Sequence, residues 1–336
     1  MDRGEVLVVR GHEVANLLDG RESELIETVR RAYIAHRRGQ SSLPHSTFLR
    51  FPDDERNRII ALPAFLGDGF EVAGLKWISS FPGNVAAGMA RASAVLILNC
   101  RATGRPRAIL ESSLISAKRT AASAAAAARA LAGEAAPRRI GLIGTGVINF
   151  EVARFLRTAW PAAARFLLFD LDRRRAAGVA EQLQSALPGV QAELADDVAA
   201  VLGGCELVSF ATTAIRPHVA DLSLCPPGAV VLHVSLRDLT PQAILASDNV
   251  VDDADHVCRA ETSVHLAEQA AGSRAFIRCT LAEILEGAAP PRDAARRVVV
   301  FSPFGLGILD LAVGKLVVDL ALDRGAGTVI DSFLPD

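Results

Sequence analysis

Apolar and polar positions alternate with two different periods along the chain of 336 residues. Residues 23–38 carry apolar side chains at helical spacing and predict an amphipathic helix. The runs around this helix alternate with a period of two, which is typical of strands; they comprise 6–9 before it and 46–51, 58–62, 72–79, 94–99 and 106–111 after it. Strands at such close spacing, with the turn-like Arg101–Gly104 before the last of them, predict an antiparallel or mixed sheet.

The pattern changes at the Ala-rich stretch 112–131, which predicts a long helix. A short apolar strand at 139–143 follows, and strands and helices then alternate. The predicted helices are 147–158, 174–187 and 196–202, and the predicted strands are 165–169, 190–194, 206–212, 229–235 and 249–251. This alternation is typical of a doubly wound parallel sheet.

A Gly-rich turn at 303–307 and a helix at 309–324 follow the last strand, and we expect them to return to the first domain. The sequence therefore predicts an α/β protein with two domains. Residues 119–301 form the parallel-sheet domain, and residues 1–118 with 302–336 form a mixed α/β domain.

Composition and charge narrow the classes of function. Half of the residues are hydrophobic, 22% are charged and the formal net charge is -2, which is ordinary for a globular protein and gives no basic stripe for nucleic acid. The apolar run Ala121–Ala128 is far too short to span a membrane, and the N-terminus carries no export signal. Five cysteines without a CxxC pair indicate reduced thiols rather than zinc ligands. We therefore expect a cytoplasmic protein with no metal, membrane or nucleic-acid partner.

The strongest chemical signal is a Gly-rich turn between the strand at 139–143 and the following helix. Its residues Gly144, Thr145, Gly146, Val147, Ile148 and Asn149 form a G-x-G-x-x-G pattern with Asn in the third position. The first Gly makes the tight turn, and the second lets the backbone approach a pyrophosphate at the helix N-terminus. We infer a Rossmann-type domain that binds a dinucleotide.

An acidic residue points to the identity of the dinucleotide. Asp170 ends the next strand, where a carboxylate binds the ribose hydroxyls of NAD and repels the 2′-phosphate of NADP. Arg173–Arg175 follow at once; we interpret them as a solvated first helical turn, while a 2′-phosphate contact stays an alternative. NAD is the expected cofactor.

Several segments resemble one known family over essentially the whole chain. Leu75–Asn84, Ser116–Ser123 and Ile143–Gly146 are similar to the ornithine cyclodeaminase/mu-crystallin family. Further phrases are similar to its branch that makes L-2,3-diaminopropionate for siderophores and peptide antibiotics; they are His45–Pro52, Asn57–Pro63, Gly146–Phe150, His233–Leu239, Asp252–Arg259 and Phe301–Leu311.

The resemblance implies an enzyme that oxidises N-(2-amino-2-carboxyethyl)-L-glutamate with NAD and releases L-2,3-diaminopropionate and 2-oxoglutarate. It also implies a homodimer whose first-domain sheets pair, and a PLP-dependent synthase as the pathway neighbour that builds this amino-acid substrate. In such an enzyme the mixed domain binds substrate and forms the dimer.

The resemblance assigns roles to the charged candidates. Lys76 and Arg119 match the family's residues that bind substrate carboxylate, and Arg50 is a third candidate anchor that is equally compatible with a solvated strand end. Lys76 also stands in an apolar strand pattern, where an unpaired charge is costly. Asp238 is the candidate for proton transfer, and an alternative role is to cap the helix at 240–245.

The remaining predicted contacts are to the cofactor. Thr120 follows Arg119 where the resemblance brings a slim helix to the phosphates, and Thr212 and Thr213 end a parallel strand at its carboxyl edge. Ser235 and Gly305 complete the expected set of cofactor contacts. His233 is more simply interpreted as a buried strand histidine with a backbone partner than as a catalytic group.

Three alternatives remain open at this stage. The chain is an ornithine cyclodeaminase, a ketimine or opine-type reductase, or a mu-crystallin-like protein that binds NAD(P)H with little turnover. The path from His233 to Asp238 is shorter than the cyclodeaminase pattern, which weakens the first.

Overall fold

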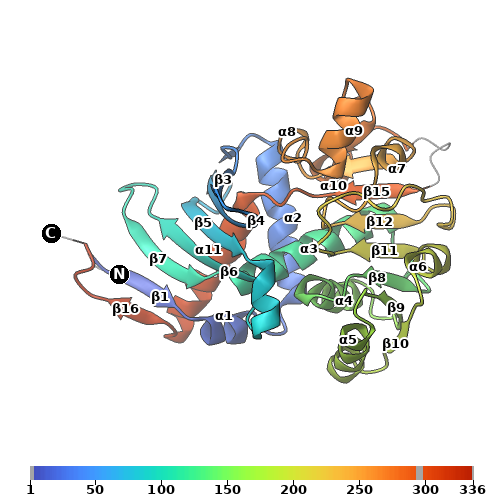
Figure 1. The fold of residues 1–336 in the computed structure, drawn as a ribbon. Coiled ribbons are helices and arrows are strands. Elements are labelled where there is room, and N and C mark those ends of the chain that lie inside the picture. Colours follow the sequence, from blue (N-terminus) through green and yellow to red (C-terminus); the bar gives the residue numbers. More distant parts are fainter. Residues whose placement is uncertain (1–3, 293–297, 335–336) are drawn as a thin grey trace. The chain divides into compact units, whose positions relative to one another are not determined.

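Two eight-stranded sheets organise the chain, which the computed structural model describes over residues 4–292 and 298–334 (Figure 1). Met1–Arg119 with Leu306–Asp336 form a first unit, and Thr120–Gly305 form a second. The second boundary falls at Leu306 rather than at the predicted residue 302, because the turn that follows the last strand stays bonded to the second unit through Asp252.

The sheet of the first unit is mixed, as the strand spacing predicts. Its strands follow the order β16-β1-β7-β6-β5-β4-β2, with β3 also paired to β4. They are β1 (Val6–Val9), β2 (Ser41–Ser42), β3 (Thr47–Phe51), β4 (Asp54–Leu66), β5 (Val72–Ser80), β6 (Ala92–Asn99), β7 (Pro106–Glu111) and β16 (Thr328–Ile330). Only β1 and β7 run parallel to each other among these pairs.

The two faces of this sheet differ because side chains alternate along each strand. On β4, Leu62, Ala64 and Leu66 are buried, whereas their neighbours are half-buried. The buried face packs against α11, which also contacts α2 and appears red in Figure 1. The helices of this unit are α1 (Gly11–Leu18), α2 (Glu22–Arg37), the 3-10 helix η1 (Pro82–Ala87) and α11 (Gly307–Arg324).

Close packing of α11 is eased by a glycine. A Cβ on Gly314 would lie 2.2 Å from a methyl carbon of Leu96 on β6, so a side chain there would force Leu96 to shift. Gly307, at the start of α11, likewise lies against Leu62 on β4.

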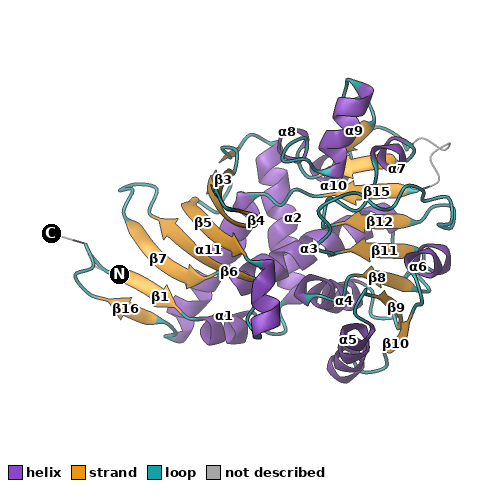
Figure 2. Cartoon of the chain, in the orientation of Figure 1, coloured by secondary structure: helices purple, strands orange, loops and turns teal. Residues whose placement is uncertain are grey.

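The sheet of the second unit is parallel throughout, which confirms the predicted fold class. Its order is β10-β9-β8-β11-β12-β15-β13-β14. The strands are β8 (Ile140–Ile143), β9 (Arg165–Phe169), β10 (Gln191–Leu194), β11 (Leu207–Phe210), β12 (Val230–His233), β13 (Asp248–Val251), β14 (Ile277–Thr280) and β15 (Val299–Ser302). Figure 2 shows these strands in orange with the helices that connect them in purple.

The helices of this unit complete the alternation. They are α4 (Val147–Ala159), α5 (Arg173–Ala186), α6 (Val198–Gly204), α7 (Pro241–Leu245), α8 (Ala254–Val257), α9 (Ser263–Ala271) and α10 (Leu281–Leu285). The helix α3 (Ser113–Ala132) contains the boundary between the units, which lies after Arg119. No helix in the described ranges is long and apolar enough to cross a membrane.

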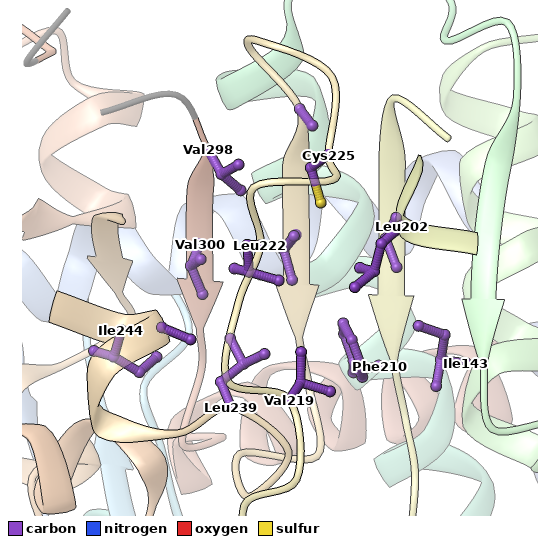
Figure 3. Close-up of a cluster of buried hydrophobic side chains, with 14 of the residues drawn as sticks. Ile143, Leu202, Phe210, Val219, Leu222, Cys225, Leu239, Ile244, Val298 and Val300 are labelled. Carbon is purple, nitrogen blue, oxygen red and sulfur yellow. The ribbon is translucent and has the colours of Figure 1, made fainter. Parts of the chain in front are cut away.

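The core of the second unit surrounds its central strands. Every residue of β8, β11, β12, β13 and β15 is buried, as expected for a parallel sheet covered on both faces. Figure 3 shows part of this core, in which Phe210 of β11 and Val300 of β15 lie among residues of the connecting segments such as Leu222 and Leu239. This core holds the carboxyl ends of the strands in place.

Candidate functional site

The first unit buries two cations against a single carboxylate. Lys76 is 2% exposed on β5, Arg119 is 8% exposed on α3, and Asp310 on α11 is fully buried. The Nζ atom of Lys76 donates to Asp310 Oδ2 at 2.7 Å, and Nε of Arg119 donates to Oδ1 at 3.1 Å. Ser116 Oγ lies 3.3 Å from Lys76 Nζ and 3.4 Å from Nη2 of Arg119. The structure therefore brings together two of the three predicted substrate anchors.

The charges in this cluster do not balance. Among the residues that the structure describes, two cations face one carboxylate, so one positive charge remains when all three groups are ionised. Burial is the main cause that lowers the pKa of Lys76 to about 8, and the charge of Arg119 adds to it, while Asp310 opposes both. An anionic ligand would relieve this excess, and a carboxylate matches both cations.

Arg50 does not share this environment. It is exposed on β3, and its guanidinium lies over the ring of Phe48, with 5.7 Å between Cζ and the ring centroid. Its assignment as a substrate anchor stays a prediction.

Asp310 is a site residue that the sequence analysis did not single out. It follows the Gly-rich turn within the apolar run Ile308–Val313, where a charged residue indicates a buried partner. An Asp within an apolar run thus predicts a buried ion pair, but the sequence does not indicate which cations the carboxylate contacts.

In the second unit, the turn after β8 has the features of a pyrophosphate cradle. Gly144 has φ +85°, and a Cβ there would lie 2.5 Å from the carbonyl oxygen of Ala211, so only glycine fits. A Cβ on Gly146 would meet nothing within 4 Å, which leaves open space over the turn. Gly146 caps α4 without a side-chain hydrogen bond, so the first N–H groups of the helix lack a capping side chain. The residues here fit an anionic phosphate.

Asn149, in the third position of the motif, lies beneath the turn. Its side chain is fully buried, and Nδ2 donates to the carbonyl oxygens of Ile143 at 3.0 Å and Gly144 at 2.7 Å. Its Oδ1 accepts from Ser209 Oγ on β11 at 2.7 Å. The side-chain amide thus ties the turn to two adjacent strands, and a contact of Asn149 with the cofactor stays a prediction.

Asp170 braces the same turn. It follows β9, and its Oδ2 accepts from the backbone N of Thr145 at 2.7 Å and from Oγ1 at 2.9 Å. Burial alone would raise the pKa of Asp170, but the N–H groups of Thr145 and Asp172 outweigh it and lower the pKa. The group is therefore an ionised acceptor at neutral pH, as a ribose-binding acid should be. The side chains of Arg173–Arg175 are exposed, in agreement with a solvated first turn of α5.

Asp238 lies at the centre of a buried polar network at the carboxyl ends of β11 and β12. Its carboxylate accepts from the hydroxyls of Thr212 and Ser235, and Oδ2 lies 3.4 Å from Nε2 of His233. Burial opposes the charged form, but the interaction with His233, followed by the hydrogen bonds from Ser235 and Thr212, outweighs it and lowers the pKa of Asp238. The alternative of helix capping is wrong, because Thr240 caps α7 and accepts from the N–H of Ala243.

His233 is buried on β12 with the backbone partner that was expected. The N–H of Asp238 lies 3.2 Å from Nε2, and Nδ1 lies 3.2 Å from Ser302 Oγ on β15. His233 therefore orients Asp238.

Gly305 is held by a second buried acid. Asp252, after β13, accepts from the N–H groups of Phe304 and Gly305, both at 2.8 Å. Burial raises the pKa of Asp252 to about 6 despite these hydrogen bonds. Gly305 is itself buried and has φ +89°. The hydrogen bonds to Asp252 therefore hold the Gly-rich turn in this conformation.

The other predicted cofactor residues border these features. Val147 is 66% exposed and Ile148 half-buried in the first turn of α4, Thr213 is exposed after β11, and Thr120 follows Arg119 on α3. Their contacts to a cofactor stay predictions. In the part of the chain that the structure describes, no group of three His, Cys, Asp or Glu residues is arranged to hold a metal ion.

Comparison with known proteins gives consistent matches over the full length. The sequence model of the ornithine cyclodeaminase/mu-crystallin family matches residues 7–325. N-((2S)-2-amino-2-carboxyethyl)-L-glutamate dehydrogenase of Staphylococcus aureus is 25% identical over 336 residues, covering 98% of this chain and 99% of that protein. Alanine dehydrogenase of Archaeoglobus fulgidus is 26% identical over 347 residues, with coverage of 98% and 99%.

A solved structure is similar to this chain over nearly its whole length. The Δ1-pyrroline-2-carboxylate reductase of Thermococcus litoralis, in complex with NADH and L-proline, superposes with a TM-score of 0.89 and 26% identity over 96% of this chain and 99% of that chain.

The lowered pKa of Lys76 predicts a pH limit for carboxylate binding. Because the ammonium form holds the anion, the dissociation constant of a small 2-oxo acid such as pyruvate should rise as the pH passes about 8. The increase should approach about tenfold per pH unit above that value, measured by titration calorimetry.

Substitutions of Lys76 test whether this residue, and not another group of the cluster, causes the pH dependence of binding. Lys76→Arg keeps its charge and should remove the rise near pH 8, whereas Lys76→Met should weaken binding below pH 8 and approach the wild type well above it. An unchanged pH profile in Lys76→Arg would assign the titration to another group.

Proposed function

Because the chain belongs to the ornithine cyclodeaminase/mu-crystallin family, we propose that it is an NAD-dependent dehydrogenase that cleaves N-(2-amino-2-carboxyethyl)-L-glutamate to L-2,3-diaminopropionate and 2-oxoglutarate. The observation that carries the proposal is the buried pair Lys76 and Arg119, which shares one carboxylate and keeps a surplus positive charge for a substrate carboxylate. The full-length relative from Staphylococcus aureus supports this specific reaction.

The first unit supplies recognition of the amino acid. Lys76 and Arg119 bind the carboxylate next to the reacting carbon, and Asp310 holds both cations in place before the substrate arrives. Preorganised cations lose little side-chain entropy on binding, which favours a defined orientation of the carbon.

The second unit supplies the cofactor site. The open space over Gly146 and the N-terminus of α4 receive the pyrophosphate, and Asp170 receives the adenosine ribose. NAD, when bound, accepts a hydride from the substrate carbon.

Asp238 takes part in proton transfer. The lowered pKa keeps its carboxylate ionised, so it can accept the proton that the secondary amine loses or activate the water that attacks the imine. Thr212 and Ser235 hold its two oxygens.

The reaction balances with one water. The carbon next to the secondary amine loses a hydride to NAD and the nitrogen loses a proton, which forms an imine. Water then adds to the imine carbon, the C–N bond breaks, and the nitrogen leaves as the amine of L-2,3-diaminopropionate. The products are this amine, 2-oxoglutarate, NADH and a proton.

A second candidate is reduction of a cyclic imine. The Δ1-pyrroline-2-carboxylate reductase from Thermococcus litoralis is as similar in sequence to this chain as the other relatives, and its complex holds NADH and L-proline. The same carboxylate site would serve that substrate, so the two candidates differ in substrate and direction.

An assay of NADH absorbance tests the proposal. Purified protein with NAD and N-(2-amino-2-carboxyethyl)-L-glutamate should produce NADH and 2-oxoglutarate in equal amounts, and L-ornithine should not replace this substrate. Asp238→Asn should lower kcat by about 10²- to 10⁴-fold because proton transfer is lost. The exposed Asp221→Asn, in the same unit, is the matched control.

Other outcomes would redirect the proposal. Consumption of ornithine with release of proline and ammonia would make the protein a cyclodeaminase. Consumption of NADH with Δ1-pyrroline-2-carboxylate alone would favour the reductase. NADH binding without turnover of any of these compounds would favour a mu-crystallin-like binding protein.

The proposal includes a homodimer formed by the exposed face of the first-unit sheet. Cross-strand partners place Ala61, Trp77 and Val95 in one row and Pro63, Leu75 and Ile97 in the next, on the face opposite to Lys76. Trp77 is 41% and Val95 40% exposed, and a contiguous apolar face of this kind is typical of an obligate interface. A second copy of this sheet provides a matching apolar surface.

A charge in this row tests the dimer. Trp77→Glu should convert the dimer to monomer at micromolar concentration in sedimentation velocity, since the charge would be buried unpaired at the interface. Leu322→Glu, which alters an exposed apolar residue on α11, should leave the dimer intact. A monomeric wild-type protein, or a dimeric Trp77→Glu, would contradict this interface.

The reaction also implies its surroundings. The proposal includes a PLP-dependent synthase that makes the substrate and a cytoplasmic location. It also includes the use of the product in a siderophore or peptide antibiotic. All five cysteines are free, which fits a reducing compartment.

A further inference from the structure

Arginines gather on the same face of the first-unit sheet as Lys76. Direct cross-strand partners share a face, and the register pairs Arg50 with Arg58 and Arg58 with Ser80. Lys76 and Ser80 lie four residues apart on β5, so they also share a face. The cross-strand row of Arg58 and Ser80 therefore lies four residues beyond the row of Lys76, which is roughly 13 Å along the strand direction.

Arg91, just before β6, joins this row. Its Nη1 donates to Ser80 Oγ at 2.8 Å, and Ser80 is 7% exposed on the buried face. The residues Arg50, Arg58, Ser80 and Arg91 are called the arginine row below.

The charge of Arg91 is not compensated. Its side chain is half-buried, and no carboxylate lies within ion-pair distance of it among the residues that the structure describes. Burial lowers the pKa of Arg91, with no acidic neighbour to oppose it. A partly desolvated guanidinium held by a hydroxyl is costly unless an anion completes its shell.

An apolar strip separates the arginine row from Lys76. Ile60 on β4, Ile78 on β5 and Phe48 on β3 form one cross-strand row on the same face, between the rows of Lys76 and Ser80. All three are half-buried, unlike Leu62 and Leu96 beside Lys76, which are buried. Basic groups thus stand at both ends of a partly exposed apolar strip.

We infer that the arginine row, centred on Arg91, binds the distal carboxylate of an elongated dicarboxylic amino-acid substrate whose reacting end is held by Lys76 and Arg119. The inference rests on the proposed function and narrows its substrate class. Methylene groups between the two anionic ends lie on Ile60 and Ile78, and the length of the lysine and arginine side chains spans the remaining distance.

This arrangement separates substrate selection from chemistry. Lys76 and Arg119 bind any 2-amino or 2-oxo carboxylate. The arginine row increases the affinity only for those ligands that carry a second carboxylate. Arg91 is then a specificity-determining residue rather than a catalytic one, and its removal should act on binding.

Two ligands that differ only in the distal carboxylate test the inference. We would measure the dissociation constants of 2-oxoglutarate and 2-oxobutyrate for the NADH-loaded protein by calorimetry. The wild type should prefer 2-oxoglutarate by about 10- to 100-fold, as expected for hydrogen bonds to a charged group. Arg91→Gln should reduce this preference to about threefold or less through 2-oxoglutarate alone.

Controls distinguish recognition from damage to the fold. Arg105→Gln, on the exposed turn before β7 of the same unit, should leave the preference unchanged. Arg91→Lys should restore part of it, because the charge returns without the bidentate geometry. Equal losses for both ligands in Arg91→Gln, or no preference in the wild type, would overturn the inference.

The outcome is separable from that of the proposed function. If N-(2-amino-2-carboxyethyl)-L-glutamate is not oxidised but the 2-oxoglutarate preference depends on Arg91, the proposed reaction is wrong and the dicarboxylate site stands. If the substrate is oxidised and Arg91→Gln leaves its KM unchanged, the reaction stands and the site is wrong.

Discussion

Two buried cations that share one buried carboxylate constrain the first unit. Lys76, Arg119 and Asp310 come from a strand and two different helices, so their ion pairs join β5, α3 and α11 at one point. Burying charges costs several kcal/mol per ion, and the attraction offsets this only when the geometry is good. A purely structural role would be served as well by apolar residues of similar volume. The surplus cation is the feature from which we propose that the cluster receives a carboxylate.

The second unit uses buried polar groups in a different way. Asn149 ties the Gly-rich turn to β8 and β11, Asp170 braces it from β9, and Asp252 fixes the turn after β15. Each of these groups satisfies backbone N–H or C=O groups of an irregular segment at the carboxyl edge of the parallel sheet, where dinucleotides bind. Asp238 is held by hydroxyls and by His233 instead, so its carboxylate keeps a low pKa within a buried network. Side chains next to the strands thus hold these turns in place.

Local periodicity was sufficient for most of the fold, whereas long-range partners were not predictable. The helix 23–38 and the strands 72–79 and 106–111 match α2, β5 and β7 closely, because each pattern depends only on neighbouring residues. The predicted strand ends are less accurate: β11 ends at Phe210 rather than at Thr212, and the Thr212 hydroxyl donates to Asp238. Lys76 and Arg119 were found from burial and resemblance. Asp310 was missed because its cations lie 234 and 191 residues away in the chain. The role of Arg91 likewise depends on strand register, which one sequence does not specify.

The shared carboxylate of Asp310 holds both cations, and a double-mutant cycle on the free energy of unfolding tests this role most directly. Asp310→Asn alone should cost about 3–5 kcal/mol, because it leaves two buried cations without a partner. Adding Lys76→Met should recover much of that loss, since it removes the surplus charge and leaves Arg119 with the amide. A strong positive coupling of this kind would establish that one carboxylate compensates two cations. Additive losses within about 0.5 kcal/mol would show that the three groups do not act as a unit, and would contradict the account.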